Sequence, residues 1–283
     1  MKIIVYLILA VTVCTIAGVQ THAQSVDLMF DTARIRPVAA EPTKVEQKQV
    51  PAPKQKAEKQ VRSEAGFGIH LNTDGYSLFT EFGKSKFIDS KHGDRFYNVH
   101  LCQIEISEKK SPRELKSSSG TTNSTGGANT YIYGKINNFY VLKMGFANRK
   151  MIAGKTDNPG SVSIHWVNAL GFAAGFVKPY YLNVAGAPGP IKFSDNESSF
   201  LNPTQIIGSA GFSTGIGEMV FNPGGYFKTA FHFDFSGNLR TVWAVEAGAD
   251  LEMFEQNVQL MANTPGTTFF ADVFLAFQFG RRW

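Results

Sequence analysis

A chain of 283 residues with 43% hydrophobic residues is long enough for one large domain or two small ones. Its 24 Phe, 9 Tyr and 27 Gly are typical of twisted β-sheet and argue against a helical bundle. The formal net charge of +5 is modest, and the basic residues form no patch interleaved with aromatic residues, which excludes a typical nucleic-acid-binding protein.

Residues 1–23 have the pattern of a cleavable signal peptide. Lys2 precedes an apolar run over residues 3–19, and a small residue then stands before the expected cleavage site. Cys14 lies inside this leader. The alternative to a cleaved signal peptide is a lipoprotein acylated at Cys14, but lipoprotein signals have a small residue before the cysteine, and Val13 is not small. Cleavage leaves Cys102 alone in the mature chain, which excludes an internal disulfide and a four-cysteine metal site.

Residues 24–65 are rich in Lys, Gln, Glu, Ala and Pro and have little periodic apolar pattern. Such a segment buries too little apolar surface to offset its ordering entropy, so we expect a disordered periplasmic linker. Within it, residues 43–62 hold six Lys or Arg against two Glu. This excess favours an anionic partner such as peptidoglycan or another envelope component; a plain solvated tether is the alternative.

Residues 66–283 change to a pattern of strand, turn and strand. The alternation of apolar and polar residues predicts eight strands, over residues 67–72, 76–83, 95–107, 137–148, 161–178, 224–235, 241–253 and 268–280. Asp74 and Gly75 suit a tight hairpin turn between the first two strands. In the third strand the apolar residues change from odd to even positions after Leu101. This change predicts a bulge near Cys102. Residues 108–130 and 179–223 are predicted loops, the second one folding over one mouth of the barrel.

The last strand decides between a soluble sandwich and a membrane barrel. One of its faces is wholly apolar; the barrel-closing residues on it are Phe269, Val273, Leu275, Phe277 and Phe279. The opposite parity of the strands gathers charged residues into a predicted polar network, namely Glu81, Glu105, Lys143, Lys228, His232, Glu246, Asp250 and Asp272. His70 and Glu252 share that parity. A closed barrel with lipid outside and ion pairs inside satisfies both faces and leaves no sheet edge unpaired.

We therefore expect an all-β protein, a closed antiparallel transmembrane barrel of eight strands in the outer membrane. The interior of an eight-stranded barrel is just wide enough for side chains to fill, so a wide channel is not expected. The links after the second, fourth and sixth strands are the shorter ones, which places both termini in the periplasm; the tight turn after the first strand departs from this alternation. Trp166, Trp243, Tyr180 and Tyr181 are candidates for an interfacial aromatic girdle, with ordinary packing as the alternative.

Residues 66–280 resemble uncharacterised outer-membrane β-barrel proteins of the Bacteroidota. The resemblance rests on residues 68–83, on QIEISEKK at 103–110, on YGKINNFY at 133–140 and on KPYYL at 178–182. It implies an eight-stranded outer-membrane barrel and carries over no catalytic residue.

No nucleophile elbow, phosphate-binding loop or paired-cysteine or two-histidine metal motif occurs in the sequence, and we predict no cofactor and no metal. The leading hypothesis is a non-enzymatic structural or envelope-assembly component. Its expected partners are outer-membrane lipid and, during insertion, the barrel-assembly machinery. The alternative is a membrane-embedded enzyme or a narrow channel for a small ligand, using the acids and histidines around His232, Asp234, Glu246 and Asp250.

Overall fold

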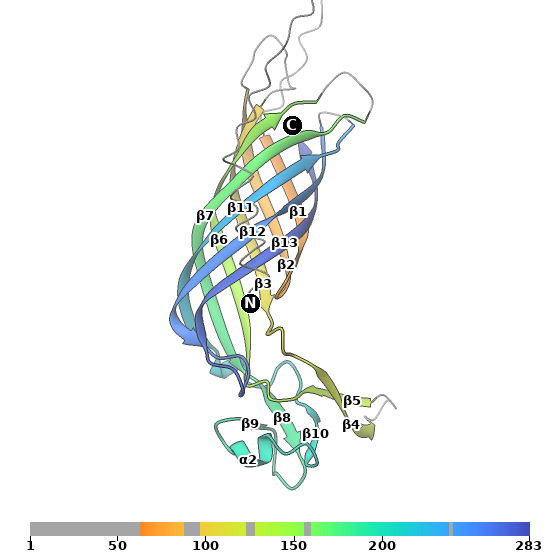
Figure 1. Cartoon of the computed structure of the whole chain (residues 1–283), viewed down its shortest axis with the longest axis vertical. Coiled ribbons are helices and arrows are strands. Elements are labelled where there is room, and N and C mark those ends of the chain that lie inside the picture. The colour runs from red at the N-terminus through yellow and green to blue at the C-terminus, as the bar shows by residue number, and fades with distance from the viewer. Residues whose placement is uncertain (1–62, 88–96, 123–127, 156–159, 238–239) are drawn as a thin grey trace, which may run out of the picture. The chain divides into compact units, whose positions relative to one another are not determined.

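The computed structural model describes residues 63–87, 97–122, 128–155, 160–237 and 240–283. The predicted signal peptide and the linker as far as residue 62 lie outside these residues. Eight long strands close into one antiparallel barrel, in the order β1, β13, β12, β11, β7, β6, β3, β2 (Figure 1). Their bounds are β1 Ser63–Asn72, β2 Gly75–Phe87, β3 Tyr97–Lys109, β6 Asn137–Ala153, β7 Ser163–Pro179, β11 Val220–Asp234, β12 Thr241–Val258 and β13 Thr267–Arg282. The prediction of a closed eight-stranded barrel is confirmed.

The register around the barrel shows how far the strands are staggered. Starting at Ser63 on β1, the paired residues on successive strands are Lys84, His100, Asn148, Asn168, Thr229, Ala249 and Val273. The carbonyl of Val273 then accepts a hydrogen bond of 3.1 Å from the amide of Thr73, ten residues after the starting point. A shear of ten in an eight-stranded barrel tilts the strands and leaves an interior that side chains can fill.

The strands are longer than predicted at several ends. β1 begins at Ser63, three residues before the expected boundary at 66, and β3 continues to Lys109. The predicted bulge near Cys102 is wrong, because β3 pairs with β2 and β6 in an unbroken register. Tyr97 and Leu101 face the lumen together with the polar residues further along the strand, because the lumen is apolar at their level. The shift in apolar parity along this strand therefore reflects a change in the polarity of the lumen and not a bulge.

The connections differ at the two ends of the barrel. The end that holds Ser63 and Arg282 has links over residues 88–96, 154–162 and 235–240. The other end has the predicted tight turn, since β1 ends at Asn72 and β2 begins at Gly75, and links over residues 110–136, 180–219 and 259–266. We call these the terminal end and the loop end.

The two longest links at the loop end contain secondary structure of their own, where loops were predicted. β4 Lys116–Thr122 pairs with β5 Ala128–Ile132, and β8 Tyr181–Val184 pairs with both β9 Ile191–Lys192 and β10 Ile206–Ser209. The helices here are short: α2 spans Glu197–Phe200 and η2 spans Ile216–Glu218. A small apolar cluster packs among these elements: Tyr131, Ile136, Leu182, Val184, Phe200 and Ile206. We call the described residues of 110–136 and 180–219 the loop lobe.

Among the described residues, no helix is long and apolar enough to cross a bilayer.

Two glycines make room for a large side chain in the barrel interior. Gly145 and Gly171 are register partners on β6 and β7. A Cβ atom on Gly171 would lie 2.2 Å from the carbonyl oxygen of Met144 and 2.8 Å from the ring of Tyr226. A side chain at this position would therefore collide with backbone, whereas glycine lets the Tyr226 ring cross the lumen.

Candidate functional site: the barrel lumen

The outer surface of the barrel is apolar. On β13 the five predicted barrel-closing residues all face outward, with exposed fractions of 52% for Phe269, 60% for Val273, 40% for Leu275, 42% for Phe277 and 39% for Phe279. Neighbouring strands continue the band with large exposed side chains, namely Phe67, Ile69, Leu78, Phe82, Phe146, Leu170, Phe172, Phe227, Phe231 and Leu251. A continuous apolar surface of this kind around a closed barrel matches a lipid environment and not water.

The candidate girdle residues divide into two groups. Trp166 and Trp243 face outward toward the terminal end, with exposed fractions of 46% and 60%. Tyr180 instead lies in the loop lobe, where its hydroxyl accepts a hydrogen bond of 3.1 Å from the amide of Ile132 and burial raises its pKa. The hydroxyl of Tyr181 bonds to a loop carboxylate. The girdle interpretation therefore fits the tryptophans, and local packing fits the tyrosines.

The barrel interior holds all eight residues of the predicted polar network. None of them is more than 3% exposed. They come from β2, β3, β6, β11, β12 and β13, so the barrel brings together side chains that lie far apart in sequence. The register separates them into three groups along the barrel, which we call the loop-end, central and terminal clusters.

Two lysines organise the loop-end cluster. The ammonium of Lys143 lies 2.8 Å from Glu105 Oε1 and 3.0 Å from Glu252 Oε1, and it also bonds to Asp250. Lys109 shares Glu252 at 3.1 Å, lies 3.1 Å from Asp74, and bonds to Asp272. Each cation thus faces three carboxylates, which is the compensation that buried charges need.

The central cluster pairs histidines with glutamates. His232 Nδ1 lies 3.3 Å from Glu246 Oε2, and Lys228 Nζ lies 3.3 Å from the other oxygen of Glu246. His70 Nδ1 lies 3.3 Å from Glu105 Oε1, which also accepts a hydrogen bond of 2.7 Å from a serine hydroxyl on β2. Glu105 therefore links the central cluster to Lys143 in the loop-end cluster.

Two arginines organise the terminal cluster. Arg282 lies 2.6 Å from Glu64 and 2.7 Å from Asp234. Arg149 bonds to the second oxygen of Glu64 and also to Glu81. These planar guanidinium groups bridge β1, β2, β6, β11 and β13 and so hold together the end of the barrel where β1 begins and β13 ends.

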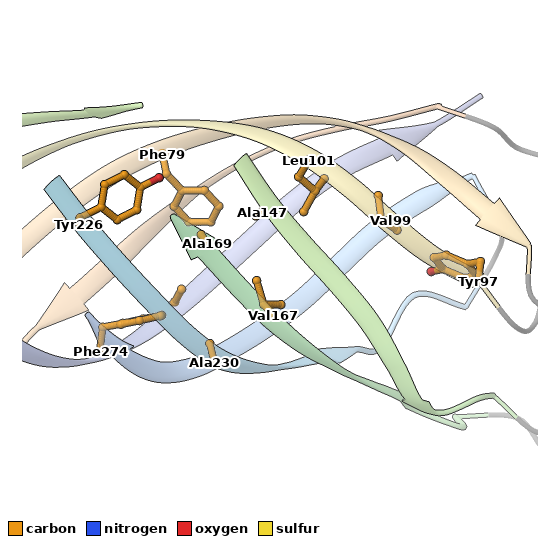
Figure 2. Close-up of a cluster of buried hydrophobic side chains, with 11 residues drawn as sticks. Phe79, Tyr97, Val99, Leu101, Ala147, Val167, Ala169, Tyr226, Ala230 and Phe274 are labelled. Atoms are coloured by element: carbon orange, nitrogen blue, oxygen red, sulfur yellow. The ribbon is translucent and has the colours of Figure 1, made fainter. Parts of the chain in front are cut away.

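Apolar side chains fill the space that the charges leave. One group of apolar side chains points into the barrel beside the central and terminal clusters (Figure 2). Its members are Phe79, Tyr97, Val99, Leu101, Ala147, Val167, Ala169, Tyr226, Ala230, Phe274 and Ala276. Toward the loop end a second group contains Phe139, Phe254 and the partly buried Phe270, with ring centroids 4.9 to 5.9 Å apart. The described part of the lumen is thus packed with side chains.

Several members of the clusters were missed from the sequence, and they share a position near a strand end. The sequence pattern places Glu64 in the linker, Lys109 in a loop, and Arg149 and Arg282 in the residues after a strand. Asp74 was read as a turn residue. Continuing the strand parity by one to three residues beyond the predicted ends would have placed Glu64, Lys109 and Arg149 in the lumen.

Some buried polar atoms have no partner among the described residues. They include His70 Nε2, His232 Nε2, both ring nitrogens of His165 and both amide atoms of Gln103. Buried polar atoms of this kind are commonly satisfied by ordered water. Within the described ranges, no group of three or more His, Cys, Asp or Glu side chains is placed to hold a metal ion. The chemistry of the lumen is that of paired charges.

Comparisons with known proteins give a distant likeness in solved structures. No family model matches the chain, and no curated protein matches it. Neisserial surface protein A is 8% identical over 78% of this chain and 96% of its own, with a TM-score of 0.36. Ail, the attachment invasion locus protein of Yersinia pestis, is 7% identical over 80% of this chain and 100% of its own, with a TM-score of 0.35. The structure of Ail in complex with the heparin analogue sucrose octasulfate is 8% identical in sequence over 80% of this chain and 100% of its own, with a TM-score of 0.34.

Proposed function

We propose that the protein is an integral outer-membrane barrel that serves as a non-enzymatic structural or envelope-assembly component. The observation that supports this most is the contrast between the two faces of the barrel: apolar side chains outside, and charges paired across the lumen inside. The acids and histidines of the alternative hypothesis are engaged in those pairs. His232 and Glu246 bond to each other, and Asp234 and Asp250 each bond to a cation.

The proposal includes an orientation. One end of the barrel holds both barrel termini and short links, and the other end holds the long links. This arrangement is typical of barrels whose termini face the periplasm. The loop lobe would then lie outside the cell, where a folded surface is available to partners. Outer-membrane lipid and, during insertion, the barrel-assembly machinery are the proposed partners of the barrel. We also keep as a proposal that the chain belongs with the Bacteroidota barrels that residues 66–280 resemble.

A conductance measurement separates the packed lumen from a narrow channel. In planar bilayers the folded protein is expected to show no step conductance, because side chains fill the lumen. Glu246→Gln removes the carboxylate between His232 and Lys228, and should lower the free energy of unfolding by about 1–3 kcal/mol without creating conductance. Steps in the wild-type protein that disappear in a folded Glu246→Gln variant would favour the channel instead.

The linker is proposed as a second contact point with the envelope. A proline-rich extended chain rises about 3.1 Å per residue, so residues 24–62 would reach on the order of 100 Å, enough to touch peptidoglycan or another envelope protein. Deleting residues 26–62 keeps the leader and all of β1, and the barrel should still fold. The deletion is expected to abolish co-purification of an anionic partner that salt also disrupts. Unchanged partners after deletion would make this segment an inert spacer.

A further inference from the structure

Among the residues that the structure describes, one largely covered lysine has no carboxylate partner. Lys178, near the loop end of β7, is only 4% exposed. No carboxylate of the described residues lies within ion-pair distance of its ammonium group, which sits 5.1 Å from the centre of the Phe212 ring. The other buried lysines of the described chain each contact at least one carboxylate, namely Lys109, Lys135, Lys143 and Lys228. Lys178 is therefore a largely covered lysine whose ammonium group reaches the surface and has no counter-charge in the described chain.

Lys178 faces the outside of the barrel. It follows Val177, which packs in the apolar group of the lumen, so alternation turns Lys178 outward. Its register partner on β6 is Asn138, which precedes the lumen residue Phe139 and also faces outward. Asn138 is 9% exposed, and no hydrogen bond of its side chain occurs among the described residues. An ammonium group and an amide thus lie side by side on the outer surface, with polar atoms that reach the surface and no ion-pair or hydrogen-bond partner among the described residues.

Aromatic side chains frame this pair. Phe212 of the loop lobe covers Lys178 and packs edge-on against Tyr140, with ring centroids 6.1 Å apart. Phe176 is the outward residue on β7 just before Lys178, and its ring lies 5.7 Å from that of Phe221 on β11. Lys178 is the next outward position on β7 beyond these two rings. Lys178 and Asn138 therefore lie at the boundary of the apolar band, which is where the headgroups of membrane lipids are found.

We propose that Lys178 and Asn138 bind the phosphate group of a lipid headgroup at the loop end of the barrel. A phosphate supplies the opposite charge for the ammonium group and accepts the hydrogen bond that the amide donates. The Phe212 ring lies over the ammonium group from the lobe side. The inference rests on the proposed function, because it requires the apolar band to lie in lipid; with the loop end outside, the ligand is a phosphorylated lipid of the outer leaflet.

The test measures lipid retention by the full-length protein in a non-ionic detergent, by native mass spectrometry. The probes are diphosphorylated lipid A and the same lipid without its phosphates. Wild-type protein should bind the phosphorylated form more tightly, Lys178→Gln should weaken that binding about tenfold, and Asn138→Ala should weaken it about threefold. Lys178→Arg should stay close to wild type. Lys150→Gln, at an exposed outward lysine near the terminal end of β6, is the matched control and should change nothing.

Three results would overturn the proposal. Lys178→Gln could match Lys150→Gln, the phosphate-free lipid could bind as tightly as the phosphorylated one, or inorganic phosphate in excess could displace the lipid and occupy the site as a soluble anion. Heat-dependent migration of each variant on a gel confirms that it is folded. Failure of the lipid test with folded variants rejects this site alone, whereas absence of the protein from the membrane rejects the proposed function.

Discussion

Replacing Lys143 with methionine is expected to lower the free energy of unfolding by about 3–5 kcal/mol. Methionine has similar length, so the change removes the charge and leaves little cavity. Glu105, Asp250 and Glu252 would then remain buried without their shared cation. The measurement is urea unfolding in lipid vesicles, followed by tryptophan fluorescence of the three Trp residues.

The control for this prediction is Lys150→Met, at an exposed lysine on the same strand. It should change the free energy of unfolding by less than about 0.5 kcal/mol. Adding Asp250→Asn to Lys143→Met should recover part of the loss, because one of the uncompensated anions is removed. If Lys143→Met is as stable as wild type, the lumen charges do not hold the barrel together in the way proposed.

Leu275→Arg on β13 should cost about 2–4 kcal/mol when the protein is folded in a bilayer. Leu275 lies near the middle of the outward apolar row from Phe269 to Phe279, so its side chain should meet the centre of the hydrocarbon layer. Arginine there must carry a charge into lipid or distort the bilayer. In a soluble protein the same substitution at a residue 40% exposed would cost almost nothing.

The matched control is Ile152→Arg, at another exposed aliphatic residue that lies near the terminal end of β6. Near the interface the penalty should fall to about 0–1 kcal/mol. Equilibrium unfolding in vesicles gives the free energy of unfolding of each variant. The difference between the two values reports how deeply Leu275 and Ile152 lie in the bilayer. Equal costs at both positions would mean that the apolar band does not lie in a bilayer.

The centres of the strands could be predicted from the sequence, and their ends could not. On β11, β12 and β13 the alternation is regular enough to assign every side chain to a face, as for Lys228 and Glu246. Near the ends, charged residues such as Lys109, Arg149 and Arg282 resemble loop or tail residues. They join the strands because the barrel offers each of them an opposite charge across the lumen, which is a tertiary effect that no local pattern shows.

The pairing inside the lumen also required the structure. Parity places Lys143 and Glu252 on the same face but says nothing about their separation, which depends on the stagger of all eight strands. The apolar part of the lumen misled the prediction for β3, where Val99 and Leu101 face inward. In the loop lobe, β4 consists mostly of Ser and Thr without alternation, and it makes contacts that no local pattern shows, such as the hydrogen bond of 2.5 Å from the Ser119 hydroxyl to the carbonyl of Ile207.

The central claim is that the chain is an integral outer-membrane barrel, and cell fractionation with gel migration tests it most directly. Membranes of cells that express the full-length chain are separated on a density gradient and run on a gel with and without boiling. The account predicts that the protein is found in the outer-membrane fraction and that the unboiled form migrates faster, because the closed barrel resists detergent unfolding. Recovery of the protein entirely in the soluble periplasmic fraction, with no effect of boiling on its migration, would contradict the account.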